Sequence, residues 1–195
     1  MTDEEFIGGA IKEMVTHSVT IQFIKRKNNS KFSANYFSVE NDKNPVFTIN
    51  YFDSNLDMEI FIHEYCHFLQ WKTYTKIWHD GLAAINHADA WTEGEIPYCD
   101  IFHIHAIQKL ELDADKRAVK LIEKHKLSVD VPSYIKHSNA YVLSYFSMYK
   151  NKNINIFPKY GRPEILACVP DKHITARYLL RDHSKIVELF DKTLK

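Results

Sequence analysis

Apolar and polar residues near the start of the chain follow first a helical and then an alternating pattern. Apolar residues recur at helical spacing over residues 2–15, which predicts a short amphipathic helix. Three segments with alternating, aromatic or β-branched residues follow at 18–25, 31–40 and 46–52. Short polar turns separate them at 28–30 and 41–45. The pattern therefore predicts an initial helix followed by a small antiparallel sheet.

Helical spacing dominates the remainder of the chain. About twenty residues from Asp57 onward are predicted to form a helix, with Ser54 or Asn55 as its N-cap. Residues 78–99 hold two glycines and a proline, which predicts an irregular segment. Further helices are expected at 100–126, 138–150 and 174–194, with a break at Pro132 and a mostly irregular stretch over 151–172.

Length and composition indicate a globular protein with one domain. The chain has 195 residues, of which 45% are hydrophobic, and glycine and proline are scarce. Disordered, collagen-like and low-complexity classes are therefore excluded. We expect a single α+β domain, with a helix and sheet over 1–52, metal-site helices over 53–126 and a C-terminal helical part over 127–195.

Charge and cysteine content narrow the expected environment and partners. Lys+Arg and Asp+Glu each total 25, so no positive surplus is available to attract nucleic acid. The chain has neither a basic-apolar leader nor a long apolar run, so we expect no secretion signal and no membrane span. Three cysteines, which cannot all pair, favour a reducing, cytoplasmic location. Lysine outnumbers arginine 20 to 5, which is typical of AT-rich phage and bacterial genomes.

An HExxH motif lies within the helix predicted from Asp57. Its residues are His63-Glu64-Tyr65-Cys66-His67, with apolar residues on both sides. Positions i and i+4 lie one turn apart on one helix face, so both imidazoles can reach one Zn²⁺ ion. Glu64 stands beside them, where a carboxylate can take a proton from a water that zinc activates. The alternative is a structural helix with two chance histidines, but burying His, Glu and His requires a compensating partner.

A catalytic zinc needs a third protein ligand and an open fourth position. The metzincin pattern HExxHxxGxxH is excluded, because Gln70 and Thr73 occupy the required glycine and histidine positions. The predicted helix over 100–126 carries Glu111 and Asp115 on one face. Glu111 is the expected third ligand, and Asp115 can accept the second ring N–H of a ligand histidine.

HExxH followed by a helix with the pattern ExxAD resembles the gluzincin metallopeptidases, a group that includes thermolysin and the small minigluzincins. The resemblance covers residues 46–122, and its specific part is the two motifs. It implies a zincin-like fold, with His63, His67 and Glu111 as zinc ligands, Glu64 as general base and Asp115 supporting a ligand. It also implies that an edge strand pairs with an extended peptide substrate. No counterpart is evident for the downstream His or Tyr that supports the oxyanion in thermolysin-like enzymes.

Several other residues are weaker candidates for the site. His79 follows the motif at a distance comparable to the third ligand of SprT-type proteases, so it is the alternative third ligand. Candidate transition-state donors are Tyr141, His137, Tyr160 and His173. Tyr141 belongs to a stripe with Tyr145 and Tyr149, a pattern more typical of a core or groove face. His87 is expected in a solvated loop, with a second metal site or a lid as the alternative, and His103 at the helix surface.

The sequence thus predicts a zinc-dependent peptidase that acts on a peptide or protein substrate, without nucleic acid or membrane partners. Zn²⁺ would polarise the scissile carbonyl and Glu64 would transfer the proton. Two alternatives stay open: a non-catalytic zincin-fold binding or regulatory module, and a zinc hydrolase of a non-peptide amide. An intact Glu64 favours an enzyme, because a structural site does not need a general base.

Overall fold

The computed structural model describes residues 1–25, 36–40, 43–51, 57–152 and 161–192. It has an α+β architecture of mostly helices with a small three-stranded sheet, as the sequence predicts. The chain divides into two compact units, each built from two stretches of sequence. The first unit comprises residues 1–74 and 117–129, and the second comprises 75–116 and 130–195.

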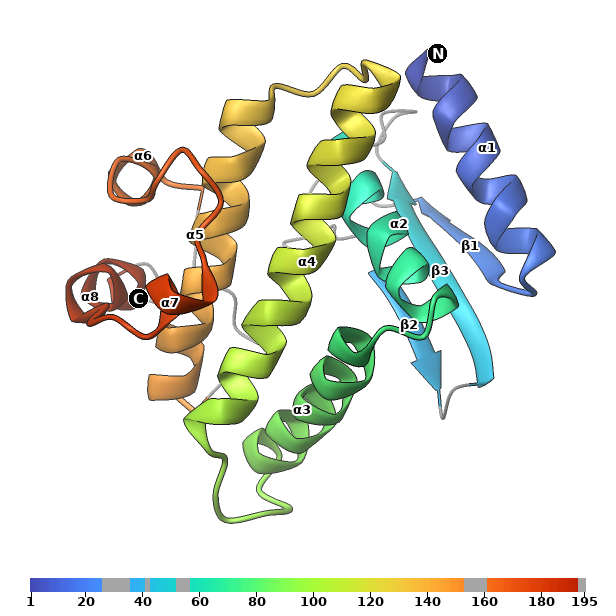
Figure 1. Ribbon diagram of the computed structural model, residues 1–195. Coiled ribbons are helices and arrows are strands. Elements are labelled where there is room, and N and C mark those ends of the chain that lie inside the picture. Colours follow the sequence, from blue (N-terminus) through green and yellow to red (C-terminus); the bar gives the residue numbers. More distant parts are fainter. Residues whose placement is uncertain (26–35, 41–42, 52–56, 153–160, 193–195) are drawn as a thin grey trace. The chain divides into compact units, whose positions relative to one another are not determined.

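The first unit begins with helix α1 (Asp3–Thr16) and the sheet (Figure 1). Thr2 caps α1, because its hydroxyl accepts from the Glu5 N–H while the Glu5 carboxylate accepts from the Thr2 N–H. Strand β1 (Thr20–Lys25) follows, then β2 (Tyr36–Glu40) and β3 (Lys43–Tyr51). The predicted turn at 28–30 and part of the turn at 41–45 lie outside the described residues.

The sheet is mixed, so the predicted antiparallel arrangement is wrong for one of its two strand pairs. The strand order is β1-β3-β2, with β2 antiparallel and β1 parallel to β3. The sequence indicates which segments extend but does not indicate which strand lies in the centre. β3 follows β2 after a short connection, pairs antiparallel with it and lies between β2 and β1. The direction of β3 relative to β1 is therefore set by this tertiary arrangement and not by the local residue pattern.

Helix α2 (Met58–Lys72) packs its aromatic residues on this sheet. Phe61 of α2 contacts Phe47 of β3 with ring centroids 5.5 Å apart, and Phe68 contacts Phe37 of β2 at 6.0 Å. The helix is capped by the Asp57 carboxylate, which accepts from the Ile60 N–H. The predicted caps, Ser54 and Asn55, lie outside the described residues.

Contacts from α1 also anchor α2. Phe6 of α1 meets Tyr65 of α2 edge to face and also contacts His125, at the end of helix α4 (Ile101–His125). Glu13 of α1 accepts hydrogen bonds from the Tyr65 hydroxyl and from Lys72. Burial raises the pKa of Glu13, but the bonds and charge of its partners outweigh this and hold the pKa below its ordinary value.

The second unit contains helix α3 (Lys76–Thr92), where the sequence predicts an irregular segment over 78–99. The prediction is wrong over most of that range because Gly81 is not a breaker. An added Cβ at Gly81 would lie 2.7 Å from Leu110 of α4, so glycine is required there for close helix packing. The buried face of α3 is formed by Trp78, Gly81, Ala84, Ala88 and Trp91, which recur at helical spacing.

Helix α4 confirms the long helix predicted over 100–126, and helix α5 (Val131–Lys150) begins earlier than expected. Pro132 lies in the first turn of α5, where backbone N–H groups have no partner within the helix. The missing N–H of proline therefore costs nothing there, and Pro132 starts a helix rather than ending one. The Asp130 carboxylate caps α5 by accepting from the Ser133 N–H. An apolar cluster within this unit joins α3, α4 and α5 through residues that include Ile104, Ile107, Tyr145 and Met148.

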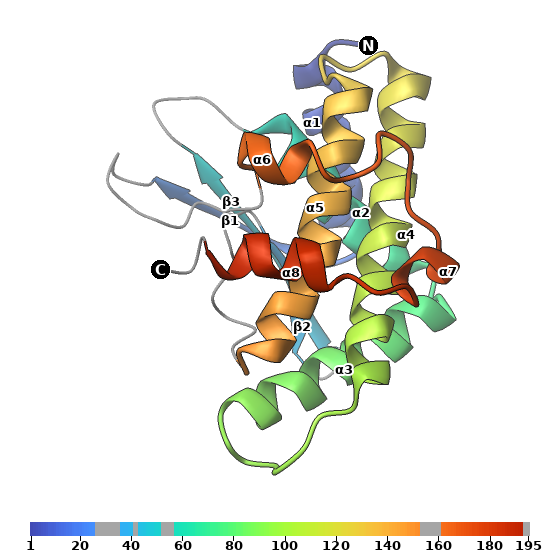
Figure 2. The ribbon, with the colours of Figure 1, turned by 90° about the vertical axis from the view of Figure 1, so that its left-hand side faces the viewer.

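Short helices complete the second unit. They are α6 (Pro163–Leu166), α7 (Ala176–Leu179) and α8 (Ser184–Asp191). Two of them, α6 and α8, lie along α5 (Figure 2). The predicted continuous helix over 174–194 is therefore wrong, because the segment after Leu179 breaks before α8. Ile165, Leu179 and Phe190 bury their side chains against α5 residues such as Leu143. None of the helices in the described part of the chain has the length and apolar character needed to cross a membrane.

Candidate metal centre

The first unit places His63, Glu64 and His67 of the HExxH motif on α2. The Nε2 atoms of His63 and His67 lie 3.1 Å apart, and the two rings stand at 88° to each other. We call these residues the α2 histidine pair. His67 is buried and His63 half-buried, so both imidazoles are largely removed from water.

The spacing of the α2 histidine pair fits a single tetrahedral zinc ion. With Zn–N bonds of about 2.05 Å, two ligand nitrogens of a tetrahedral site lie about 3.3 Å apart. The observed separation of 3.1 Å is close to this value. Perpendicular rings also allow two in-plane lone pairs to converge on one point. The arrangement is therefore able to accommodate a shared cation in place of the direct contact between the two ring nitrogens.

Gln70 orients His67 from one turn further along α2. Its Oε1 atom lies 2.8 Å from His67 Nδ1, and both side chains are buried. Because an amide oxygen only accepts, Nδ1 carries the proton and Nε2 keeps its lone pair. In the sequence, Gln70 only excludes a metzincin, and the predicted supporting group is a carboxylate, Asp115. The signal that would have found it is the spacing His-x-x-Gln, which places the amide one turn from the ring.

Glu64 points to the edge strand of the sheet. Its Oε2 atom accepts the backbone N–H of Phe37 in β2 at 2.9 Å. Phe37 pairs in register with Phe47 of β3, so β2 is tied to the sheet on one side and to the motif helix on the other. The hydrogen bond fixes the Glu64 carboxylate on the β2 side of α2, adjacent in sequence to His63.

The second unit holds Glu111, the predicted third ligand, in a buried position on α4. The Tyr145 hydroxyl donates to Glu111 Oε1 at 3.3 Å, and the Tyr141 hydroxyl lies 3.0 Å from that of Tyr145. Tyr141 was predicted as a transition-state donor, whereas Tyr145 was not. The stripe of tyrosines on α5 was the available signal, because its residues share the face that meets α4.

Asp115, one turn after Glu111, is buried among hydroxyl groups of α5. Its two carboxylate oxygens accept from Tyr134 at 2.8 Å and from Ser138. His173 lies in the same environment, with both ring nitrogens buried and without a hydrogen bond to any described residue. Burial lowers the pKa of His173 and so does the charge of Lys116, which together outweigh the opposing effect of Asp115.

The other predicted site residues are dispersed through the second unit. His79 lies on α3 and His137 on α5, both half-buried, and Tyr160 lies outside the described residues. Glu111 or His79 as third ligand, and Asp115 as the support of a ligand histidine, stay predictions. For His67, the partner of the second ring nitrogen is Gln70.

The described residues thus include groups of His, Cys and Glu side chains that are able to hold a metal ion. Comparison of the chain with protein-family models, curated proteins and solved structures finds no match. The chemistry of the side chains therefore carries the functional inference.

Proposed function

We propose that the chain is a zinc-dependent peptidase centred on α2. The observation that carries the proposal is the α2 histidine pair, with Nε2 atoms 3.1 Å apart and His67 fixed in its ligand tautomer by Gln70. Two imidazole nitrogens this close together on one helix face are able to share a cation, which supports metal binding. Imidazole nitrogens with a carboxylate favour Zn²⁺ among the available ions.

His63, His67 and Glu111 would hold the zinc ion. A bound zinc supplies a water with a pKa lowered to about 7 and polarises a substrate carbonyl. The support for Glu111 comes from its position in the ExxAD pattern and from its burial on α4.

Glu64 would serve as the general base. Its carboxylate would accept the proton of the attacking water and then donate it to the leaving amine. The hydrogen bond from the Phe37 N–H to Oε2 fixes the orientation of the carboxylate that would take the proton. The same bond places the base beside β2, an edge strand, where an extended peptide could pair.

Two other functions differ from this one in a measurable way. A non-catalytic zincin-fold module would bind zinc and cleave nothing, and a zinc amidase would cleave amides other than peptide bonds. The edge strand beside Glu64 favours a peptide over a small amide. Glu64 directly follows His63 and is not one of the proposed ligands. A carboxylate at this position favours an enzyme, because a structural site does not need a general base.

A peptide library incubated with the zinc-loaded chain and read by mass spectrometry tests the proposal. We expect cleavage that a chelator stops, and a Glu64→Gln variant that keeps zinc but loses roughly 10²–10⁴-fold in rate, because the amide cannot accept a proton. Cys168→Ser, at an exposed free cysteine, is the control and should cleave like wild type. Full zinc loading without any cleavage supports the module instead. A Glu64→Gln variant as fast as wild type contradicts the assigned role of Glu64.

A further inference from the structure

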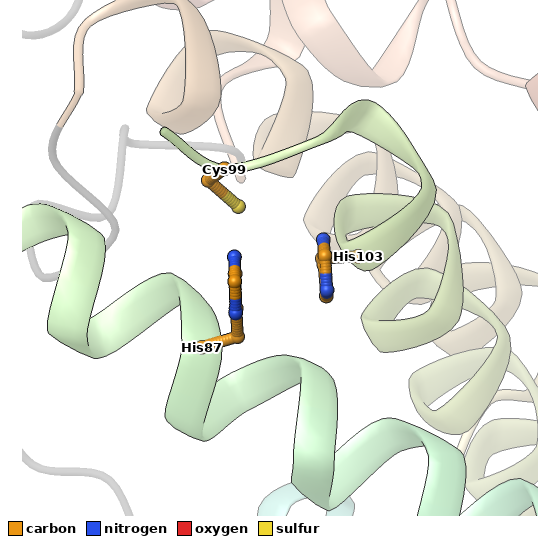
Figure 3. A group of neighbouring side chains, drawn as sticks. All are labelled: His87, Cys99 and His103. Carbon is orange, nitrogen blue, oxygen red and sulfur yellow. The ribbon is translucent and has the colours of Figure 1, made fainter. Parts of the chain in front are cut away.

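A second group of metal-ligating side chains lies entirely within the second unit, away from the HExxH motif. It comprises His87 of α3, Cys99 before α4 and His103 in the first turn of α4, which we call the α3–α4 cluster. Each residue offers a ligand atom, and these atoms all lie within 4.8 Å of one another. Figure 3 shows the two imidazole rings face to face, with the Cys99 thiol directed toward them.

The backbone around Cys99 is held firmly by its surroundings. The Tyr149 hydroxyl of α5 donates to the Cys99 carbonyl at 3.1 Å. The next residue, Asp100, starts α4, because its carboxylate accepts from the Phe102 N–H and its carbonyl from the His103 N–H. Cys99 itself is 1% exposed and packs in the apolar cluster that joins α3, α4 and α5. The thiol is therefore presented at a fixed position rather than on a mobile loop.

The polar atoms of the α3–α4 cluster make few and weak hydrogen bonds. Nδ1 of His103 is buried and has no hydrogen-bond partner among the described residues. His87 Nε2 reaches the Tyr98 carbonyl at 3.3 Å, and the Cys99 thiol reaches the Asp100 carbonyl at 3.7 Å. A buried ring nitrogen without a partner costs free energy that a bound cation would recover. Three ligand groups with few other hydrogen bonds are therefore available at one point to share a cation.

We propose that His87, Cys99 and His103 form a second zinc site, distinct from the catalytic zinc proposed above. One sulfur and two nitrogen ligands suit the borderline-soft Zn²⁺ ion, with water in the fourth position. The site joins α3 to the start of α4 across the connection at residues 93–100. Zinc bound there would add its binding free energy to the stability of the fold.

Zinc binding requires two local changes in the α3–α4 cluster. The imidazole rings are stacked, with centroids 3.9 Å apart and planes at 3°. Since the lone pairs lie in the ring planes, two parallel rings cannot direct them to one ion, and at least one ring must turn. Burial and the charge of Asp100 raise the pKa of the Cys99 thiol, so binding releases its proton to solvent as the zinc–sulfur bond forms.

Cobalt substitution of the full-length chain tests the proposal. Co²⁺ bound to a thiolate gives a sulfur-to-cobalt charge-transfer absorption that histidine and carboxylate ligands do not give. We expect this absorption in wild type, its persistence in a His63→Ala/His67→Ala variant and its loss in Cys99→Ser. Cys168→Ser, at the exposed free cysteine, should retain it. Absence of the absorption in the wild type, or its survival in Cys99→Ser, overturns the second site.

Metal counting separates this proposal from the catalytic one. By mass spectrometry we expect about two zinc ions per wild-type chain, and about one in either Cys99→Ser or the His63→Ala/His67→Ala variant. His87→Gln, at a half-buried position, provides a second test if Cys99→Ser fails to fold by circular dichroism. If the His63→Ala/His67→Ala variant is folded but metal-free, the second site is refuted while the first stands. If it keeps all its zinc, the first is refuted.

Discussion

The two imidazole rings of the α2 histidine pair stand at 88°, whereas those of the α3–α4 cluster are stacked at 3°. In the first case Gln70 fixes the tautomer of His67, and the two Nε2 atoms already have the separation of zinc ligands. In the second case no side chain among the described residues orients either ring, and Nδ1 of His103 lacks a partner. The pair is therefore organised for a metal before binding, while the cluster must rearrange.

The two groups also differ in which elements provide their ligands. The α2 histidine pair offers two nitrogens from a single helix and needs a third ligand from another element, as catalytic zinc sites do. The α3–α4 cluster has three ligand groups within one unit, one of them a thiol, and needs only a water to complete a four-coordinate site.

The largest expected effect concerns the missing ligand of the α2 histidine pair. Glu111→Gln should weaken zinc affinity far more than His79→Ala, because a neutral amide oxygen is a poor zinc ligand. Glutamine keeps the volume and can still accept from Tyr145, so folding is preserved. Competition with a chromogenic chelator measures both affinities. The reverse ranking would assign the third position to His79.

A smaller effect is expected from Gln70, which organises the pair. Gln70→Met keeps the volume but leaves the Nδ1–H of His67 without an acceptor, so zinc affinity should fall about 10–100-fold. Asp115→Asn changes the predicted support of a ligand histidine and should lower zinc affinity by a similar factor. Gln108→Met is the matched control, because Gln108 Oε1 contacts His105 Nδ1 at 3.0 Å with the same spacing on α4. Equal losses in Gln70→Met and Gln108→Met would remove Gln70 from the site.

Helix packing beneath the α3–α4 cluster depends on Gly81. Gly81→Ala places a methyl group 2.7 Å from the Leu110 Cβ, an atom that cannot rotate away. Overpacking costs about 1–3 kcal/mol, so we expect a net loss of unfolding free energy despite the better helix propensity of alanine. Gly9→Ala in α1 meets nothing within 4 Å and should gain about 0.5–1 kcal/mol. Denaturant unfolding measures both, and a stabilised Gly81→Ala would show that α3 and α4 separate easily.

The smallest effect is acid sensitivity, which both units should share. Glu13 in the first unit and Asp191 in the second each have a pKa below the ordinary value. Burial raises the pKa of Asp191, but hydrogen bonds from Lys150, Ser147 and Asn151 outweigh it. A depressed carboxyl pKa contributes stability that is present above the ordinary pKa and is lost as pH falls through the folded-state value. Thermal unfolding followed from pH 7 downward should therefore show a decline that Glu13→Gln reduces.

Unequal decline in the two units would sharpen the comparison. Glu13 joins α1 to α2 through Tyr65 and Lys72, so its protonation loosens the scaffold of the α2 histidine pair. Asp191 joins α8 to α5 through Ser147, Lys150 and Asn151, none of which belongs to the α3–α4 cluster. The loss of the Glu13–Tyr65 contact should accordingly change the near-ultraviolet circular dichroism of a Glu13→Gln variant at neutral pH. The control is Asp80→Asn, which removes the exposed ion pair of Asp80 with Lys76 and should leave the spectrum unchanged.

The sequence alone determined the elements whose signals are local. The helix at residues 2–15, the long helix at 100–126 and the HExxH face follow from spacing within one segment, because residues three and four apart share a helix face. Gly81 and Pro132 were misread for the same reason. Their effects depend on Leu110 across the helix interface and on the first-turn position in α5, neither of which a local pattern contains.

Tertiary structure alone decided the direction of β1 relative to β3 and the grouping of His87, Cys99 and His103. These three residues are 12 and 4 positions apart and belong to two helices and the segment between them, so no periodicity connects them. Their convergence results from the close approach of α3 and α4 at Gly81 and from the hold of Tyr149 on the Cys99 backbone. A sequence encodes ligands on one helix directly, whereas ligands from separate elements meet only when packing brings their backbones together.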